Sequence, residues 1–192
     1  MRTALGSADD VALALHGLVG AVCRAASMVF AWTALLDRGW RPGTPAGTTL
    51  PPVAVTEPAA HRVSEALRLW PVAWLLSRQV TAAPELGGVP LVPGARLYLC
   101  TYLLHRDPDV WAAPGAYRPS RWARPPEGHK ARYMPYGFGG AACVGSRFVN
   151  RASAAVLDCW TAFDDVALRI VEPGPVFGSL LSPPVVRPVI TR

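Results

Sequence analysis

A glycine-rich loop with a single cysteine constrains this chain more than any other stretch. Residues 136–145 read YGFGGAACVG, and a helical pattern begins directly afterwards at Ser146. Glycine has no Cβ, so such a loop can turn sharply and lie flat against a planar ligand. Cys143 stands just before the expected helix N-terminus, where backbone N–H groups and positive potential favour a thiolate. Two interpretations follow: a ligand-binding thiolate, or a glycine turn with a buried, inert cysteine.

The loop resembles the haem-ligand loop of cytochromes P450, whose pattern is aromatic-Gly-x-Gly-x-Arg/His-x-Cys-x-Gly. The positions that match it in order and spacing are Tyr136, Gly137, Gly139, Cys143 and Gly145. Tyr136 replaces the more usual Phe, and Ala141 replaces the basic residue. The resemblance implies that these five residues bind haem b (iron protoporphyrin IX), with Cys143 as the axial ligand of the iron.

A second motif, Glu65-x-x-Arg68, lies in a predicted helix over residues 58–70. A spacing of three residues places both side chains on one face of the helix, where they can pair. An ordinary surface pair satisfies the same spacing and contributes little. The motif resembles the K-helix of cytochromes P450, and the segment YRPSRW resembles the stretch whose arginine, here Arg121, joins that pair. The resemblance implies a buried Glu65–Arg68–Arg121 triad that supports the cysteine loop.

Arg78 lies thirteen residues after Glu65, where the family resemblance implies an arginine that binds a haem propionate. A planar guanidinium is suited to that contact. Ala141 removes a basic residue that would contact a propionate, and Arg132 and His129 are the candidates to replace it.

The longest apolar stretch covers residues 11–36 and predicts a helix over residues 9–38. Its length also fits a membrane span or a signal peptide. His16 and Arg24 interrupt it, and a charge near the centre of a span is costly. A long buried helix that ends at Gly39, in the C′ position, is the favoured interpretation.

This helix resembles the central I-helix of cytochromes P450, which crosses over the haem and carries an acid–alcohol pair. Arg24 stands where the acid belongs, and Ala25 stands where the threonine belongs. The resemblance therefore implies that the usual distal route for protons is missing. An arginine at the acid's place also resembles the peroxide-using branch of the family, so Arg24 is a candidate distal catalytic residue.

The predicted fold is mainly α with small β-sheets (α+β), in one cytochrome P450-like domain that corresponds to the C-terminal half of the family's fold. The 20 prolines indicate many irregular connections rather than a simple bundle. Residues 41–58 are predicted to form a loop. The other expected segments are short strands at 78–103, a meander and cysteine loop at 123–145, a helix at 146–163, and strands and turns at 164–192.

The resemblance implies a monooxygenase that inserts one oxygen atom from O2 into a small organic substrate, with electrons from a ferredoxin or flavoprotein. Arg147 and Arg151 are candidates to face such an acidic partner, or form a plain solvated face. The alternatives are a non-catalytic remnant, half of a split protein that needs a complementary N-terminal chain, a peroxide-driven peroxygenase, and an unrelated membrane-anchored binding domain.

Composition excludes some other classes. The net charge of +6 comes mostly from scattered arginines, without the basic runs typical of nucleic-acid binding. The four cysteines lack zinc-ligand spacing and the density of a secreted disulfide scaffold. We therefore expect a reducing, cytoplasmic location, no nucleic-acid partner and no membrane association.

Overall fold

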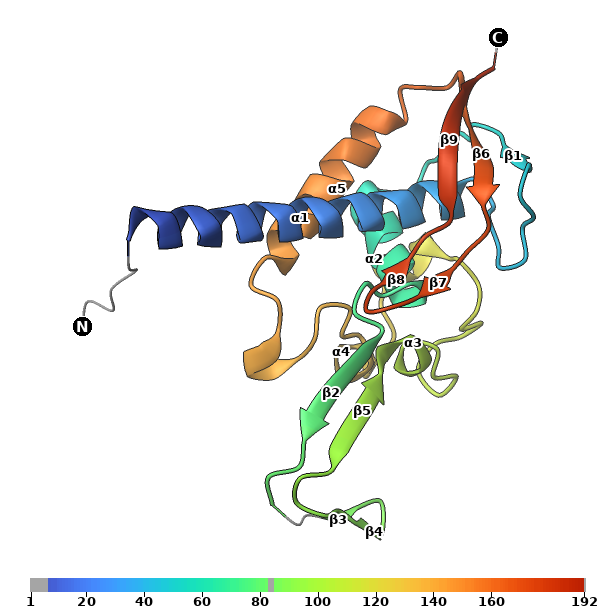
Figure 1. The fold of residues 1–192 in the computed structure, drawn as a ribbon. Coiled ribbons are helices and arrows are strands. Elements are labelled where there is room, and N and C mark those ends of the chain that lie inside the picture. Colours follow the sequence, from blue (N-terminus) through green and yellow to red (C-terminus); the bar gives the residue numbers. More distant parts are fainter. Residues whose placement is uncertain (1–6, 83–84, 192) are drawn as a thin grey trace.

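The computed structural model describes residues 7–82 and 85–191. It combines helices with small antiparallel sheets, which confirms the predicted fold class (Figure 1). The helices are α1 (Ala8–Asp37), α2 (Ala59–Leu69), α3 (Thr101–Leu104), α4 (His129–Arg132) and α5 (Ser146–Trp160), with 3-10 helices η1 (Pro119–Ala123) and η2 (Gly139–Ala141).

The strands form four small antiparallel sheets. β1 (Thr49–Leu50), β6 (Val166–Glu172) and β9 (Val185–Ile190) pair in the order β1-β6-β9. The other sheets have two strands each: β2 (Leu75–Gln79) with β5 (Arg96–Cys100), β3 (Glu85–Leu86) with β4 (Val89–Pro90), and β7 (Val176–Phe177) with β8 (Leu181–Ser182).

Both ends of α1 carry the signals that define helix boundaries. Ser7 forms a capping box with Asp10, in which each residue's side chain bonds the other's backbone N–H. At the other end Gly39 has φ of 79°, its N–H donates to Leu36, and the N–H of Trp40 donates to Leu35. This is the Schellman pattern, so Gly39 occupies the C′ position as predicted.

The prediction that α1 is buried along its length is wrong. Burial is confined to its last third, from Met28 to Leu36, where α2 and α5 pack against it. The N-terminal part of α1 projects beyond those helices, which leaves Leu13 72% and Val19 59% exposed (Figure 1). By its length and the mean hydropathy of an 18-residue window (1.6), α1 could cross a membrane. Core helices and signal sequences pass the same test, and 11% of this window is buried.

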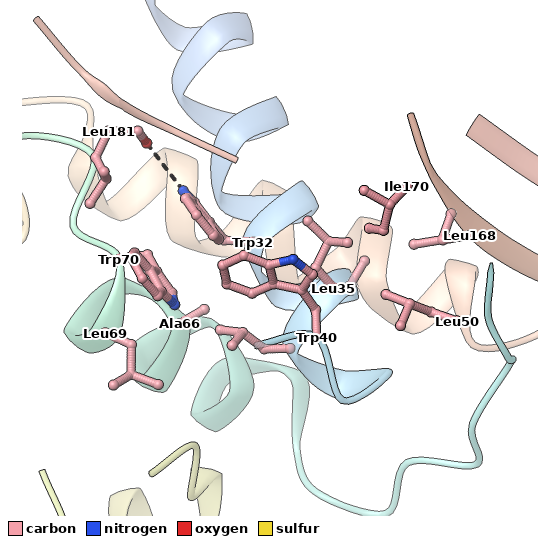
Figure 2. Close-up of a cluster of buried hydrophobic side chains, with 12 residues drawn as sticks. Trp32, Leu35, Trp40, Leu50, Ala66, Leu69, Trp70, Leu168, Ile170 and Leu181 are labelled. Atoms are coloured by element: carbon pink, nitrogen blue, oxygen red, sulfur yellow. Dashed lines mark hydrogen bonds between the residues drawn. The ribbon is translucent and has the colours of Figure 1, made fainter. Parts of the chain in front are cut away.

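Three tryptophans join the C-terminal third of α1 to α2 (Figure 2). The rings of Trp32 and Trp70 stack at 4.7 Å, and Trp40 meets both edge-on at 5.4 and 5.5 Å. The indole N–H of Trp32 donates to the carbonyl of Leu181 (3.2 Å), which ties the C-terminal strands to the same core. Aromatic rings supply large buried area, so this cluster fixes where α1 and α2 cross.

A second apolar cluster positions α5, the helix that follows the cysteine. Val149 and Leu157 of α5 are buried with Met28 and Val29 of α1 and with residues of α2. Because these helices pack together, the start of α5 has a fixed place relative to α1.

Several predicted boundaries differ from the observed ones. The predicted loop at 41–58 contains β1, because Thr49 and Leu50 pair with β6. The predicted irregular meander contains the short helix α4. The strand region begins at Leu75 rather than at residue 78, and α5 ends at Trp160 rather than at residue 163. Each difference is a short element that depends on pairing or on a single turn, which sequence periodicity resolves poorly.

Candidate functional site

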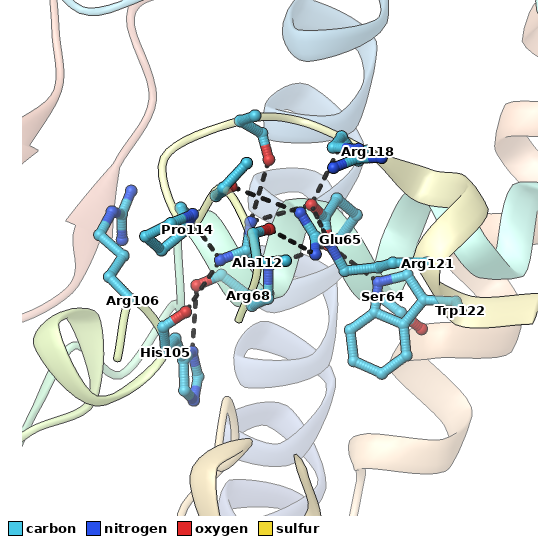
Figure 3. Close-up of polar contacts among 12 residues, drawn as sticks. Ser64, Glu65, Arg68, His105, Arg106, Ala112, Pro114, Arg118, Arg121 and Trp122 are labelled. Carbon is cyan, nitrogen blue, oxygen red and sulfur yellow. Dashed lines mark hydrogen bonds and ion pairs between the residues drawn. The ribbon is translucent and has the colours of Figure 1, made fainter. Parts of the chain in front are cut away.

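The carboxylate of Glu65 lies at the centre of a buried charge network (Figure 3). Its Oε1 accepts hydrogen bonds from Arg68 Nη2 and Arg121 Nε, each at 2.9 Å, and its Oε2 accepts from Arg68 Nε at 3.0 Å. The backbone N–H of Arg118 and the indole N–H of Trp122 add two bonds of 3.0 Å. The structure thus brings Glu65, Arg68 and Arg121 together. Arg118 and Arg121 lie 53 and 56 residues after Glu65 in the sequence.

Arg68 extends the network to backbone carbonyls. Its Nη1 donates to His105 (2.8 Å) and Pro114 (2.7 Å), and its Nη2 donates to Ala116 (3.1 Å). Its guanidinium also lies over the ring of Trp111, 5.2 Å from the centroid. The pair Glu65–Arg68 therefore holds residues 105–116 against α2. Every side-chain N–H group of Arg68 has an acceptor.

His105 connects this network to the segment that precedes the cysteine loop. Its Nδ1 lies 3.1 Å from the carbonyl of Arg68, and its Nε2 accepts the backbone N–H of Met134 (2.8 Å). The bond from Met134 requires an unprotonated Nε2, so the proton is on Nδ1. Burial lowers the pKa of His105 to about 4, so the ring is neutral at pH 7. Sequence reasoning did not single out His105, because a lone histidine in a Leu-His-Arg stretch carries no spacing signal.

The cysteine loop is closed by its own backbone. Gly137 and Gly139 adopt positive φ values of 86° and 63°, which favour glycine. The N–H of Cys143 donates to the carbonyl of Tyr136 (2.9 Å), and the N–H of Gly137 donates to that of Met134 (3.2 Å).

We expected backbone N–H groups of the loop to point at the sulfur. In the described parts of the chain no N–H donates to Cys143 Sγ, so that expectation is wrong. The loop N–H groups of Gly137, Ala142 and Cys143 are instead used in turns, because the positive φ values at the glycines direct them onto carbonyls.

The Tyr136 hydroxyl ties the loop to α5. It donates to Asn150 Oδ1 at 2.6 Å. Burial raises the pKa of this hydroxyl, and the nearby Cys143 raises it further. The change from the family's usual Phe to Tyr136 is therefore matched by a hydrogen-bond partner one helical turn into α5. Nothing in the sequence alone linked these two residues.

Cys143 is exposed, and so are three large apolar side chains near it in the sequence. Phe138 is 64% exposed, Val144 is 96% exposed and Phe148 is 62% exposed. A Cβ built on Gly145 would lie 3.8 Å from Cys143 Sγ and 3.9 Å from Val22 of α1. The sulfur therefore faces the region between the start of α5 and the middle of α1.

A cavity of about 540 Å³ lies along α1, in the same part of the molecule as Val22. Small residues of α1 form one wall, including Gly17, Gly20 and Ala25. Val72 and Leu180 form the other wall, and His16 and Arg24 are the charged or titratable side chains that line it. Arg24 is exposed and Ala25 is half-buried, so the arginine reaches this cavity without a neighbouring hydroxyl.

The predicted propionate ligands have different surroundings. Arg78 lies exposed on β2, and its one side-chain hydrogen bond to the described residues runs from Nη1 to the adjacent carbonyl of Ser77 (2.8 Å). Arg132 is paired with Asp107 (3.1 Å), and His129 is hydrogen-bonded to the carbonyl of Pro126. Arg78 is thus available for an anion, whereas Arg132 already has an acidic partner.

The donor set fits a haem. One exposed cysteine lies just before α5, exposed apolar residues lie near it in the sequence, and Gly139 and Gly140 have no heavy atom within 4 Å of where a Cβ would be. An apolar rim suits the porphyrin face, and Arg78 is a free cation for a propionate. His/Cys/Asp/Glu groups that could hold a bare metal ion are absent from the described residues.

Known proteins are similar in sequence to the part of the chain that contains this site. The sequence profile of the family described as Cytochrome P450 matches residues 60–157. The chain is 40% identical over 103 residues to cyclooctatin synthase of Streptomyces melanosporofaciens, and 38% identical over 88 residues to cytochrome P450 3A30 of Fundulus heteroclitus. These matches cover 50% and 45% of this chain but only 22% and 18% of the relatives, so the matched part is about a fifth of their length.

The fold is also similar to solved structures. The crystal structure of CYP175A1 from Thermus thermophilus superimposes with a TM-score of 0.64 at 27% sequence identity. The superposition covers 85% of this chain and 41% of that one.

Proposed function

The chain belongs to the cytochrome P450 family, and we propose that Cys143 binds the iron of a haem b in a monooxygenase that inserts one oxygen atom from O2 into a small organic substrate. The observation that carries this proposal is the exposed Cys143 thiol, which lies directly before α5 at the end of a loop braced by the Glu65 network. The chain spans about two fifths of the length of the solved structures that it resembles. The proposed activity is therefore that of the whole protein.

Different residues of the chain would bind the haem and hold the cysteine loop in position. Cys143 supplies a thiolate, and haem bound to a thiolate supplies O2 activation. Arg78 binds one propionate, because its exposed guanidinium keeps most of its N–H groups free. Tyr136 and His105 hold the loop in place through Asn150 and Met134. These contacts keep the sulfur in position without taking part in the chemistry.

The 540 Å³ cavity along α1 would hold the substrate. Its size falls within the range of about 300–1,000 Å³ for small-molecule sites. Arg24 replaces the acid and Ala25 replaces the hydroxyl of the usual proton-delivery pair. Proton transfer on this side must therefore come from water or from a group on the substrate.

The proposed electron donor is a ferredoxin or a flavoprotein. Arg147 and Arg151 are exposed in the first two turns of α5, on the helix that begins just after Cys143. Their charge suits an acidic partner. We also propose a cytoplasmic location, because all four cysteines are free thiols.

A CO-difference spectrum of the haem-reconstituted chain tests the ligand. We expect the thiolate signature in the parent chain and its loss in Cys143→Ser. Cys23→Ser, Cys100→Ser and Cys159→Ser serve as matched controls and should retain it. Loss of the signature in a control variant, or its persistence in Cys143→Ser, would overturn the assignment.

A second candidate reaction is peroxide-driven oxygenation, favoured by the position of Arg24 on the wall of the cavity. An arginine there can bind the carboxylate of a fatty acid, whose second oxygen then accepts or returns a proton. The test is peroxide-driven turnover of the reconstituted chain with and without a fatty acid. Absence of product in both reactions excludes this candidate.

The exposed apolar side of α1 favours a further requirement: additional polypeptide that covers it, such as a complementary N-terminal half. Leu13, Leu15, Leu18 and Val19 are each more than half exposed. Exposed apolar surface of this kind is typical of an interaction face. Haem retention should rise when such a segment is co-expressed. If the chain binds no haem in either state, the non-catalytic alternative holds.

A further inference from the structure

A second cavity, of about 180 Å³, lies at the C-terminal end of α1, outside the proposed haem site. Four segments line it: Arg38 at the end of α1, residues 52–55, Arg62 of α2, and the end of α5 with the turn that follows, residues 160–164. The packing of α1 against α2 and α5 brings these segments together.

Two residues that line this cavity each carry a buried donor atom without an acceptor among the described residues. Arg38 is only 8% exposed, and its Nε has no hydrogen-bond acceptor among the described residues. The indole N–H of Trp160 is likewise buried and unpaired in that part of the chain. The Arg38 guanidinium lies 5.2 Å from the centre of the Trp160 ring, so both groups belong to one wall. Burying such donors without acceptors costs free energy, which an acceptor that reaches them would offset.

Two buried guanidiniums, those of Arg38 and Arg62, belong to residues that line the cavity. Arg62 is paired with Asp37, and the other oxygen of Asp37 accepts the hydroxyl of Tyr117 at 2.7 Å. Arg38 makes one long bond of 3.3 Å, from Nη1 to the carbonyl of Ala34. Asp37 is thus paired with Arg62, whereas Arg38 forms no ion pair among the described residues.

The pKa of Arg38 responds to the same environment. Burial lowers it, nearby Asp37 opposes that shift, and Arg62 adds to it. The remaining acidic group on the cavity wall is Asp164, which is exposed at the rim.

We propose that this cavity binds a small organic carboxylate. Its carboxylate would accept from the Arg38 guanidinium and the Trp160 indole N–H, since guanidinium matches the planar geometry of carboxylate. Its apolar body would contact Val53, Val55 and Phe163. The cavity is smaller than a typical site of about 300 Å³ or more for drug-sized ligands, so the ligand is an acid the size of one ring or a short chain.

Sodium benzoate is the probe, and benzamide is its neutral isostere. The chain is labelled with ¹⁵N, and the indole resonance of Trp160 is assigned by its loss in Trp160→Phe. Benzoate should shift this resonance in a saturable way. Benzamide should bind at least about tenfold more weakly, as should benzoate to Arg38→Gln, because a charge-assisted bond is lost.

Two further variants and a second anion test whether benzoate binds in this cavity. Asp164→Asn removes the competing carboxylate and should tighten benzoate binding. Arg24→Gln, in the other cavity, should leave the Trp160 shift unchanged. Inorganic phosphate should bind more weakly than benzoate, because it offers nothing to the apolar wall. The proposal is overturned if benzoate leaves the Trp160 resonance unmoved, if Arg38→Gln folds and binds as tightly as the parent chain, or if phosphate matches benzoate.

Discussion

Replacing Glu65 by Gln tests whether the buried charge network holds the fold together. The side chain keeps its length, but the negative charge disappears. Glu65 has no exposed surface, and its two oxygens accept five hydrogen bonds. In the variant one carboxylate oxygen becomes an NH₂ group that faces the donors of Arg68, Arg121 or Trp122.

The magnitude follows from what remains in the interior. Arg68 is fully buried and Arg121 has a side chain only 9% exposed, so two guanidiniums lose their counter-ion. Breaking a buried pair in this way costs about 3–5 kcal/mol. That is a large part of the roughly 5–15 kcal/mol by which domains are stable, so Glu65→Gln should unfold at a much lower urea concentration.

Equilibrium urea unfolding followed by tryptophan fluorescence measures the effect. The control is Arg132→Gln, which breaks the pair with Asp107, where the two side chains are 44% and 24% exposed. An exposed pair contributes about 0–1 kcal/mol, so the control should differ little from the parent chain. If Glu65→Gln and Arg132→Gln cost the same within about 1 kcal/mol, the buried network does not hold the fold together.

Three further predictions follow from single contacts. The pKa of His105 is about 4 in the folded chain, below its usual value near 6.5, so the unfolded chain binds an extra proton as the pH falls. The free energy of unfolding should therefore fall by about 2 kcal/mol between pH 7 and pH 5. Urea midpoints at the two pH values measure this loss, and His105→Asn should remove the part that His105 causes. Tyr136→Phe should cost about 1 kcal/mol by leaving Asn150 Oδ1 without its donor, and a loss no larger in the parent chain than in an Asn150→Leu background would contradict the contact. Gly39→Ala should cost about 1–2 kcal/mol in thermal unfolding because φ is 79°, whereas Gly115→Ala, at ordinary φ with open space around it, should be nearly neutral.

Local geometry explains why part of the site was predictable. Glu65 and Arg68 are three residues apart on one helix, so helical geometry alone brings them together. Gly39 follows the last apolar residues of α1, and its role at C′ depends only on its neighbours. The cysteine loop and the start of α5 were found at the same residues in sequence and structure, since glycines and helical periodicity mark them. Arg121 was named through family resemblance, because no local rule connects it to Glu65.

The amino-acid sequence by itself determined the three long helices, the C-terminal cap of α1 and the place of Cys143 before α5, because these follow from interactions between residues a few positions apart. Only the tertiary structure decided that α1 is buried in its last third alone, that His105 joins Arg68 to Met134, and that Arg38 and Trp160 share a cavity. Those contacts join segments that lie tens of residues apart. Their geometry depends on how proline-rich connections route the chain and on how the tryptophan rings pack, and neither leaves a periodic signal in the sequence.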